Sequence, residues 1–391
     1  MQIGVWEWVL IALTAFFFAV QVYWYARYMC APARRMRKTR NKEQEPANSG
    51  LPVQGVSVVI CAHNESDNLS HYIQAILSQD YPEYEVIVVD DGSEDDTRAV
   101  LESYMIHDSR LRMTFVPYGA RVGSTKKLAL TLAAKAAQYD LLLLTDADCV
   151  PESKHWISEM VKGFGHGQAA KDIVLGFGAY FYEPGHVNRL VRYDTLFNGL
   201  HYLGAALCGH PYMGVGRNLA YRKALFFESG GFTRLMTNRA GDDDLFVNHV
   251  ATRSNTAVVI SRDSLTWSPA KKTMEEWFQQ KRRHLSVSPA YRPETRFRLG
   301  LEPLTRGLFY ASFIASVVYD LLLGPDRIPV VMMAAVAIFL VRWIMQTLVI
   351  NVSARRLGLH RFNMFSVLWF DIVLPLVSAW MLTVPKRQGK W

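Results

Sequence analysis

A run of four leucines that ends at two closely spaced aspartates constrains the fold of this chain more than any other stretch. Residues 141–148 read Leu-Leu-Leu-Leu-Thr-Asp-Ala-Asp, and a short, wholly apolar run of this kind is typical of a buried strand. In an open α/β sheet the ligand crevice lies at the carboxyl ends of the strands, so Asp146 and Asp148 are predicted to lie there. Two carboxylates on one loop can hold a hard divalent cation, which can in turn hold a diphosphate.

A second predicted strand also ends at acidic residues. Residues 86–93 read Val-Ile-Val-Val-Asp-Asp-Gly-Ser, so Asp90 and Asp91 close an apolar run in the same way. Two acidic strand ends in one domain favour an enzyme that handles a nucleotide diphosphate. The alternative is that each acidic pair only caps the turn or helix that follows it.

Strands alternate with helices through the first half of the polar region, and this order predicts a doubly wound, mostly parallel α/β sheet. The predicted strands cover residues 56–60, 85–89, 111–116 and 141–144. Apolar residues recur at helical spacing after the first strand, at Leu69, Ile73, Ile76 and Leu77. No G-x-G-x-x-G follows the first strand, so the sequence gives no support to a dinucleotide-binding domain.

The amino-terminal segment has the features of an uncleaved membrane anchor. Residues 5–25 are almost uncharged and carry aromatic side chains at both edges, which is typical of a membrane-spanning helix. The segment is longer than the apolar core of a signal peptide. Basic residues follow it at once and predict that the next part of the chain is cytoplasmic: Arg27, Arg34, Arg35, Arg37, Lys38 and Arg40.

Three further apolar runs close the chain, at residues 307–323, 329–350 and 364–384. We therefore expect α-helical membrane segments on both sides of the soluble domain, in an inner or plasma membrane. The expected order is a transmembrane helix over 1–29, a basic linker over 30–52, a cytoplasmic domain over 53–300 that ends in interfacial helices, and a bundle of about three transmembrane helices over 301–391.

Counting membrane crossings leaves one conflict at the carboxyl terminus. The count places the basic loop 353–361 in the cytoplasm, as expected, but it places the basic tail 386–390 outside. Either the last apolar segment is re-entrant or tilted, or the positive-inside rule is overridden. Charged residues inside these runs, namely Asp320, Arg342 and Asp371, are expected to face the bundle interior or a polar path; Asp320 and Arg342 have snorkelling as an equal alternative.

The formal net charge of +8 comes mostly from the flanks of the apolar runs. A basic excess beside membrane helices predicts attraction to anionic lipid head groups. No basic stripe alternates with aromatic residues, so no nucleic-acid partner is expected. The four cysteines lack metal-ligand spacing and suit a reducing, cytoplasmic domain.

Seven short motifs, in order, make the soluble region resemble the family 2 inverting glycosyltransferases of GT-A fold. They are VSVVICAHNE at 56–65, VVDDGS at 88–93, DAD at 146–148, GRNLAYRK at 216–223, GGF at 230–232, GDDDL at 241–245 and QKRRH at 280–284. With its flanking helices, the chain resembles the membrane-embedded branch that includes cellulose, chitin and hyaluronan synthases. The resemblance implies a GT-A sheet domain inserted between transmembrane α-helices.

The same resemblance implies residues for binding a nucleotide-diphosphate sugar, expected to be a UDP-sugar. The nucleobase and ribose would be contacted by Ala62, Asn64, Glu65 and Asp91, and also by Asp90. Asp146 would reach the ribose or the sugar-diphosphate side of the donor. Asp148 would ligate Mg²⁺ or Mn²⁺. Lys126 would contact the nucleotide or its phosphates and Arg283 the diphosphate. The alternative for Lys126 and its neighbour Lys127 is a solvated start of a helix.

The resemblance also implies an acceptor side. Aligning the family's Asp-Leu pair on Asp244 and the next residue makes Asp242 the base, with Asp243 as the other candidate. Gln280 would bond to an acceptor sugar, and His284 stands where processive synthases carry a stacking tryptophan. Imidazole is a poorer platform for a sugar ring. The alternative for the acidic run 242–244 is the start of a helix, where the helix dipole favours negative charge. The alternative for residues 280–284 is a basic helix that lies at the membrane interface.

The implied activity is metal-assisted sugar transfer with inversion to a lipid-linked or polysaccharide acceptor at the membrane. Two alternatives remain open. The first is a processive polysaccharide synthase that also translocates its product, along a path lined by the aromatic residues Tyr310, Tyr319, Trp343, Trp369 and Trp380. The second is a catalytically silent nucleotide-sugar-binding subunit of an export complex.

Overall fold

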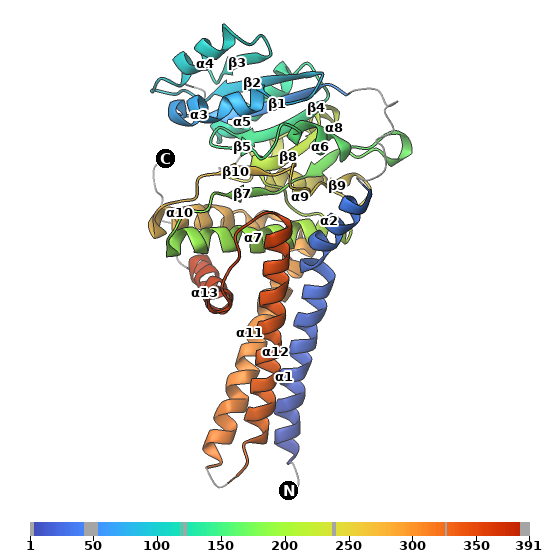
Figure 1. Cartoon of the computed structure of the whole chain (residues 1–391), viewed down its shortest axis with the longest axis vertical. Helices are drawn as coiled ribbons and strands as arrows, with labels where there is room; N and C mark the ends of the chain where they lie inside the picture. Colours follow the sequence, from blue (N-terminus) through green and yellow to red (C-terminus); the bar gives the residue numbers. More distant parts are fainter. Residues whose placement is uncertain are drawn as a thin grey trace.

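A computed structural model describes residues 4–42, 54–117, 119, 123–236, 240–324 and 327–383. A mixed α/β domain lies at one end of the molecule, and long helices form a stalk at the other (Figure 1). The predicted linker residues 43–52 and the basic tail 386–390 lie outside the described residues.

Four parallel strands form the part of the sheet that carries the acidic strand ends. They are β1 (Val56–Ala62), β2 (Tyr84–Asp90), β3 (Leu111–Phe115) and β4 (Leu141–Asp146), paired in the order β3-β2-β1-β4. The sheet continues through β8 (Leu219–Arg222), antiparallel to β4, to β6 (Ile173–Leu175) and β9 (Thr256–Val258). The predicted mostly parallel α/β sheet is therefore confirmed.

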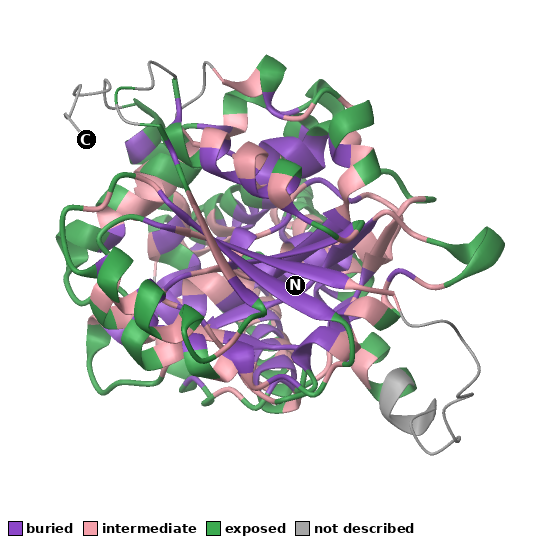
Figure 2. Ribbon diagram, turned by 90° about the horizontal axis from the view of Figure 1, so that it is seen from above, coloured by how far each residue is buried: buried purple, intermediate pink, exposed green. Residues whose placement is uncertain are grey.

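Helices cover both faces of this sheet, whose strands are buried at the centre of the domain (Figure 2). On one face, α3 (Ser66–Leu77) packs with α6 (Trp156–Lys162), and all four apolar residues predicted for the first helix are buried there. On the other face, α5 (Thr125–Ala136) packs against β1 and β2. This arrangement leaves the carboxyl ends of the strands at an edge of the domain.

Shorter elements complete the domain. A second sheet pairs β5 (Val150–Pro151), β10 (Thr266–Ser268) and β7 (Gly178–Tyr180). The short helices are α4 (Thr97–Met105), α8 (Lys223–Glu228) and α9 (Asp244–Val250), with single 3₁₀ turns at η2 (Gly167–Ala169), η3 (Gly216–Asn218), η4 (Thr233–Leu235) and η5 (Ser288–Ala290).

The stalk consists of three helices that are far apart in sequence: α1 (Val5–Trp24), α11 (Pro293–Leu322) and α12 (Val330–Arg356), which pack on one another (Figure 1). A π-helical turn, η1 (Tyr25–Met29), joins α1 to α2 (Ala31–Lys42). Residues 31–42, predicted as linker, are therefore helical. The long helix α7 (His186–Leu207) and the shorter helix α10 (Met274–Leu285) lie where the stalk meets the α/β domain (Figure 1).

The last apolar helix, α13 (Met364–Thr383), does not run along the stalk. It contacts α12, α7 and α10 and lies to one side of the stalk, just below α7 and α10 (Figure 1). The amino-terminal helix α1 is the third helix of the stalk. The carboxyl-terminal transmembrane bundle over 301–391 stays a prediction, as do both alternatives for the last apolar segment.

Within the described part of the chain, three helical segments are long and apolar enough to cross a membrane: Val5–Lys38, Val330–Arg356 and Met364–Thr383. The predicted segment at 307–323 falls within α11, which is not among them. Polar residues inside α11, such as Arg306 and Asp320, lower its hydropathy, although the helix packs along α1 and α12.

The charged residues inside the apolar runs form buried contacts. Arg342 is 1% exposed and pairs with Asp371 at 2.8 Å, and Arg306 pairs with the same carboxylate at 2.9 Å. Asp320 accepts a hydrogen bond from the backbone N–H of Met332 at 2.8 Å, near the start of α12. The side chains of Arg342 and Asp320 thus face other helices of the bundle and do not snorkel. The pairs also fix α13 to the stalk, because Asp371 belongs to α13.

Candidate active site

The carboxyl ends of β1, β2 and β4 meet at one edge of the sheet. In the strand register, Ala62 lies opposite Asp90 and Cys61 lies opposite Asp146. The two acidic strand ends therefore flank the end of β1, as the topology of parallel sheets requires. The separate sequence motifs that predicted a donor site form one surface here.

The two acidic residues after β2 have different surroundings. Asp90 is buried, and its Oδ1 accepts a hydrogen bond from the backbone N–H of Ser93 at 2.9 Å, which is the turn-capping role. Asp91 is half-buried, and its backbone N–H donates to the carbonyl of Ala62 at 2.8 Å. Burial raises the pKa of Asp91, against a lowering by the Thr125 hydroxyl. Asp91 is the carboxylate of this pair that a ligand can reach.

The loop after β1 is held by polar contacts to the turn after β2. Asn64 has a φ of 56°, in the left-handed region; its N–H donates to Ser93 Oγ at 3.0 Å and its Oδ1 accepts from the N–H of Glu94 at 2.8 Å. The N–H of Glu65 donates to Thr97 Oγ1 at 2.8 Å. Burial raises the pKa of the Glu65 carboxyl. Asn64 thus shapes the loop, and Glu65 places a half-buried carboxyl at its base.

Lys126 links the donor side of the site to the acidic run. It is the second residue of α5, and its Nζ lies 3.1 Å from Asp146 Oδ1 and 3.5 Å from Asp242 Oδ2. Asp146 and then Asp242 raise the pKa of Lys126, against a lowering by burial. Burial alone would raise the pKa of Asp146, but Lys126, with Arg217 and Arg283, lowers it. The ammonium group therefore holds two carboxylates from distant segments together.

The adjacent lysine has a different environment. Lys127 is fully buried, and its Nζ donates to the backbone carbonyls of Leu235 at 2.9 Å and Ala240 at 2.8 Å. It holds the backbone that leads into the acidic run. Of the two lysines at this helix start, only Lys126 faces the strand ends.

Asp148 lies two residues beyond the end of β4. Burial raises the pKa of its carboxyl, and Asp146 raises it further. Its Oδ1 accepts a long contact from the Cys149 thiol at 3.4 Å, and among the described residues it forms no ion pair within 4.0 Å. The described part of the chain also holds no cluster of three or more metal-ligating residues. One or two carboxylates completed by substrate oxygens is how Mg²⁺ is usually bound at nucleotides, and this donor set fits that mode.

The acidic run at the start of α9 contains three differently placed aspartates. Asp243 caps the helix: its Oδ1 accepts from the N–H of Asp244 and its Oδ2 from the N–H of Gly216, both at 2.7 Å. Asp244 is buried, and its Oδ2 accepts from the hydroxyl of Tyr291 at 2.8 Å. Burial, followed by the neighbouring aspartates, raises the pKa of Asp243 to about 6 and that of Asp244 to about 8. Asp242 is the member of the run that faces Lys126.

The raised pKa of Asp244 predicts a pH-dependent stability. Its carboxyl group has an ordinary value of 3.8 and about 8 in the folded protein, so protonation stabilises the fold, and this stabilisation is lost as pH rises from about 4 through 8. We expect the thermal midpoint of the wild type to fall between pH 5 and pH 9, and that of Asp244→Asn to fall much less. The difference corresponds to roughly a few kcal/mol, at about 1.4 kcal/mol per pKa unit.

The matched control is Asp67→Asn, which changes an exposed aspartate on α3. It should retain the pH dependence of the wild type. Equal declines in the wild type and Asp244→Asn would contradict the assignment of this dependence to Asp244.

The QKRRH motif falls on α10, which lies beside the strand ends. Gln280 Nε2 donates to the hydroxyl of Tyr180 at 3.0 Å. Lys281 pairs with Asp194 of α7 at 2.7 Å and anchors the helix. Arg283 lowers the pKa of Asp146, so its charge reaches the donor side, and His284 is exposed at the next position.

Arg217 is a site residue that the sequence reasoning missed. It stacks on the ring of Tyr180 at 4.2 Å, and its Nη1 donates to Ser268 Oγ at 2.8 Å. Burial lowers the pKa of Arg217, but Tyr180 and other nearby groups, Asp148 and Asp146 among them, raise it overall. The only sequence signal was its position in the GRNLAYRK motif. This motif contributed to the family resemblance, but no role was predicted for Arg217 within it.

Comparison with known proteins defines the class of this domain. Residues 57–230 match the model of glycosyl transferase family 2. The matched region contains β2, β4, all but the first residue of β1 and both acidic strand ends, and it ends before Asp242. The chain therefore contains a family 2 glycosyltransferase domain with a GT-A-like sheet.

Individual relatives cover smaller parts of the chain. The chain is 33% identical over 98 residues to the poly-beta-1,6-N-acetyl-D-glucosamine synthase of Staphylococcus epidermidis, which is 25% of this chain and 23% of that protein. It is 28% identical over 145 residues to the glycosyltransferase AglE of Haloferax volcanii, which is 37% of this chain and 45% of AglE. The chain thus spans under half the length of these curated relatives.

A solved structure resembles most of the chain. It is the mannosyltransferase PcManGT from Pyrobaculum calidifontis, in complex with GDP-Man and Mn²⁺. The similarity has a TM-score of 0.55 at 16% sequence identity and covers 93% of this chain and 99% of that one. At this identity the likeness extends to the fold, helices included.

Proposed function

We propose that this protein is a membrane glycosyltransferase that moves a sugar from a nucleotide-diphosphate donor to a lipid-linked or polysaccharide acceptor, with inversion. The observation that carries the proposal is the position of Lys126. It lies within 3.5 Å of Asp146, at a donor-side strand end, and of Asp242, in the acceptor-side run. A sugar that bridges these two sides would have its departing diphosphate near one carboxylate and its attacking hydroxyl near the other.

The residues suit the two demands of the reaction. Asp242 accepts the proton of the acceptor hydroxyl while the oxygen attacks the anomeric carbon from the face opposite the diphosphate. The bond between the anomeric carbon and the diphosphate oxygen breaks in the same displacement, which inverts the configuration. Arg283 and Lys126 supply positive charge beside the leaving diphosphate. A diphosphate that attracts Lys126 also draws it away from Asp242 and frees that carboxylate.

A divalent cation fits the donor side. Asp148, with Asp146 beside it, would hold Mg²⁺ or Mn²⁺, and the ion would supply charge that neutralises the two phosphates. The support from the fold is the PcManGT complex, which contains Mn²⁺ and a nucleotide sugar. The residues near the end of β1, Asp91 and Glu65 among them, would bind the nucleoside, for which we propose the uridine of a UDP-sugar.

The helices suit an acceptor held at a membrane. The stalk, the apolar α13 and the flanking cations support a position of the α/β domain at one membrane surface, and the basic flank of α1 favours the cytoplasmic side of an inner or plasma membrane. Trp369 and Trp380 of α13 are more than half exposed, as expected for side chains that contact lipid. This exposure favours a helix that holds the domain beside the bilayer over a helix that lines a sugar path.

A processive synthase is the second candidate function. The specific observation in its favour is the similarity to the poly-beta-1,6-N-acetyl-D-glucosamine synthase, although that match covers only 23% of the relative. His284 in place of a stacking tryptophan, and α13 to one side of the stalk, favour short products.

Product length distinguishes the candidates. Purified full-length protein in lipid vesicles is supplied with a panel of labelled UDP- and GDP-sugars and with membrane extracts that contain lipid-linked acceptors. We expect turnover with one donor and the addition of one or a few sugars, measured by mass spectrometry. Long polymer inside vesicles whose donor is supplied outside would establish the processive, translocating synthase instead. No transfer from any donor, with nucleotide-sugar binding intact, would identify a silent subunit.

A further inference from the structure

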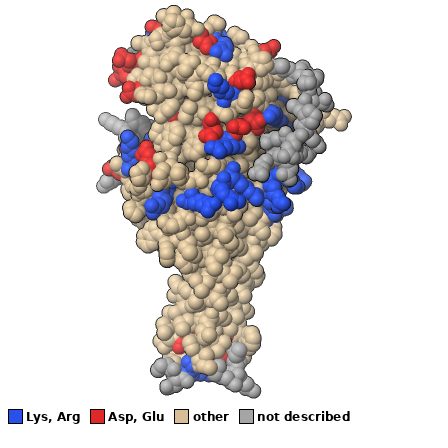
Figure 3. Space-filling model, viewed as in Figure 1, with Lys and Arg blue, Asp and Glu red and all other residues tan. Residues whose placement is uncertain are grey.

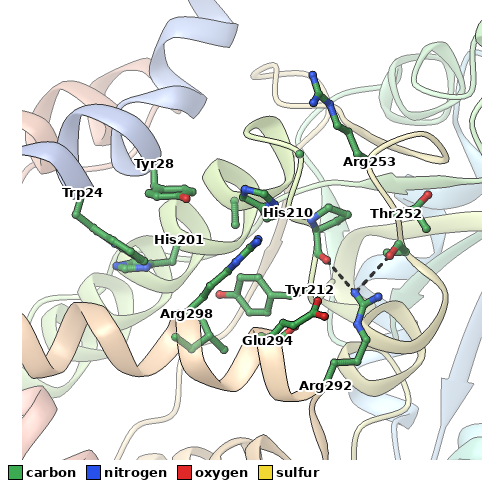
Figure 4. Close-up of a pocket in the computed structure, with 16 residues that line it drawn as sticks. Trp24, Tyr28, His201, His210, Tyr212, Thr252, Arg253, Arg292, Glu294 and Arg298 are labelled. Carbon is green, nitrogen blue, oxygen red and sulfur yellow. Dashed lines mark hydrogen bonds between the residues drawn. The ribbon is translucent and has the colours of Figure 1, made fainter.

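A cavity of about 250 Å³ lies at the junction of stalk and α/β domain, and it contains none of the candidate active-site residues (Figure 4). Four separate segments form its wall. They are the end of α1 with η1, the end of α7 with the loop that follows, the turn after α9, and the start of α11. Nothing in the proposed transfer reaction uses this cavity.

The wall of the cavity is positively charged. It includes Arg253, Arg292 and Arg298 against one acidic residue, Glu294 (Figure 4). Within the described residues, none of these arginines has a carboxylate partner within 4.0 Å. Among the described residues, the Arg292 guanidinium donates to two backbone carbonyls alone, at 3.4 and 3.5 Å. These guanidinium groups therefore retain donors for a ligand, and arginine is well suited to phosphate.

The positive charge of the arginines affects the neighbouring side chain of His210. Burial lowers the pKa of His210, which also lines the cavity, and Arg298, Arg27 and Arg253 lower it further. A site that repels protons in this way attracts anions.

Two polar atoms of the wall lack a hydrogen-bond partner. Trp24 Nε1 and His201 Nε2 are both buried, and neither has a partner in the described part of the chain. Their rings lie 6.1 Å apart and both line the cavity (Figure 4). Burial, followed by Arg306, lowers the pKa of His201 to about 3, so the ring is neutral. Buried donors without partners are rare, and the indole N–H in particular is a donor for an oxygen of a bound group.

The cavity lies at the end of the apolar amino-terminal helix. Trp24 is the last residue of α1, and Tyr28 follows within the same apolar segment. Lysine and arginine side chains form a band where the α/β domain narrows into the stalk (Figure 3). Aromatic side chains and cations of this kind mark the head-group region of a bilayer.

We propose that this cavity binds the phosphate head group of an anionic membrane lipid. The three arginines contact the phosphate oxygens, the Trp24 indole donates to the head group, and the acyl chains remain in the bilayer beside α1. Such a lipid would fix the α/β domain to the stalk, because the cavity wall includes both. The proposal does not depend on the transfer reaction.

The test is lipid binding to the full chain in neutral detergent, measured by native mass spectrometry. The probes are dioctanoyl phosphatidylglycerol, dioctanoyl phosphatidylcholine and inorganic phosphate. We expect one phosphatidylglycerol to bind at least ~10-fold more tightly than phosphatidylcholine or inorganic phosphate, because the arginines repel the choline cation of phosphatidylcholine and inorganic phosphate has no acyl chains. The Arg253→Gln/Arg298→Gln double variant should lose this preference.

Arg355→Gln is the matched control, since Arg355 is an exposed cation in the last turn of α12 that does not line the cavity. It should retain the preference. Trp24→Phe keeps a ring but removes the N–H, and should weaken phosphatidylglycerol binding several-fold. Equal binding of the two lipids by the wild type would overturn the proposal. An equal loss of the preference in Arg355→Gln would attribute lipid binding to general surface charge and not to the cavity. Tight binding of inorganic phosphate, without a preference for phosphatidylglycerol, would identify a site for a soluble anion instead.

Discussion

Asp148→Ala should abolish sugar transfer while the protein stays folded. Asp148 is a half-buried carboxylate beside Asp146, and it forms no ion pair within 4.0 Å among the described residues. Such a group repels its neighbour unless a cation lies between them, so its removal relieves repulsion in the free protein. The same change removes the ligand that we assign to the divalent ion at the diphosphate. A functional effect without loss of stability is the signature that separates a ligand from a structural residue.

Activity, nucleotide-sugar binding and the thermal midpoint together test this prediction. Turnover should fall to the background level, and the thermal midpoint should stay at or above that of the wild type. A chelator should remove the activity of the wild type, and Mg²⁺ or Mn²⁺ should restore it. Full activity in excess chelator would remove the metal from the mechanism, and an active Asp148→Ala variant would remove this residue as its ligand.

Asp242→Asn should lower turnover by at least ~10²-fold, the usual contribution of a general base, while the donor still binds. The amide keeps the shape of the side chain but cannot accept the hydroxyl proton. Asp242 faces Lys126, whereas both carboxylate oxygens of Asp243 accept backbone hydrogen bonds at the start of α9. We therefore expect Asp243→Asn to reduce turnover less, and to lower the thermal midpoint more, because its amide nitrogen cannot accept the hydrogen bond from the Gly216 N–H.

The comparison of the two variants is the internal control. Donor binding is measured separately from single-turnover transfer, so a loss of chemistry is distinguished from a loss of affinity. Burial raises the pKa of Asp243 to about 6, a value that suits a base near neutral pH, so it is the one rival in this run. A larger loss of turnover in Asp243→Asn than in Asp242→Asn would move the base to Asp243.

The strands, the first helix and the acidic strand ends could be predicted because their signals are local. The leucine run at 141–144 lies in β4, and the four apolar residues of the first helix lie on the buried face of α3. Residues of these types at those spacings leave few other ways to bury apolar surface. The family match over residues 57–230 then confirmed the resemblance that the motifs had suggested.

The packing of the apolar helices could not be predicted from local sequence signals. Hydropathy located the apolar segments, but it did not say which of them pack together. α1 joins α11 and α12 in the stalk, whereas α13 lies beside the stalk and its Asp371 pairs with Arg306 and Arg342. Charge pairs between helices depend on partners that are distant in sequence, so neither the stalk nor the place of α13 was readable from one segment at a time.

The sequence by itself determined the class of fold, the family and the strand ends at which a nucleotide diphosphate would be expected, because periodicity and short motifs are properties of contiguous residues. Only the tertiary structure decided which partners the acidic residues have. Asp90 caps a turn and Asp243 caps a helix, whereas Asp242 faces Lys126. It also brought Arg217 to the site and assembled the cationic cavity from four distant segments. Side-chain proximity of this kind arises from packing between elements, which no spacing along the chain records.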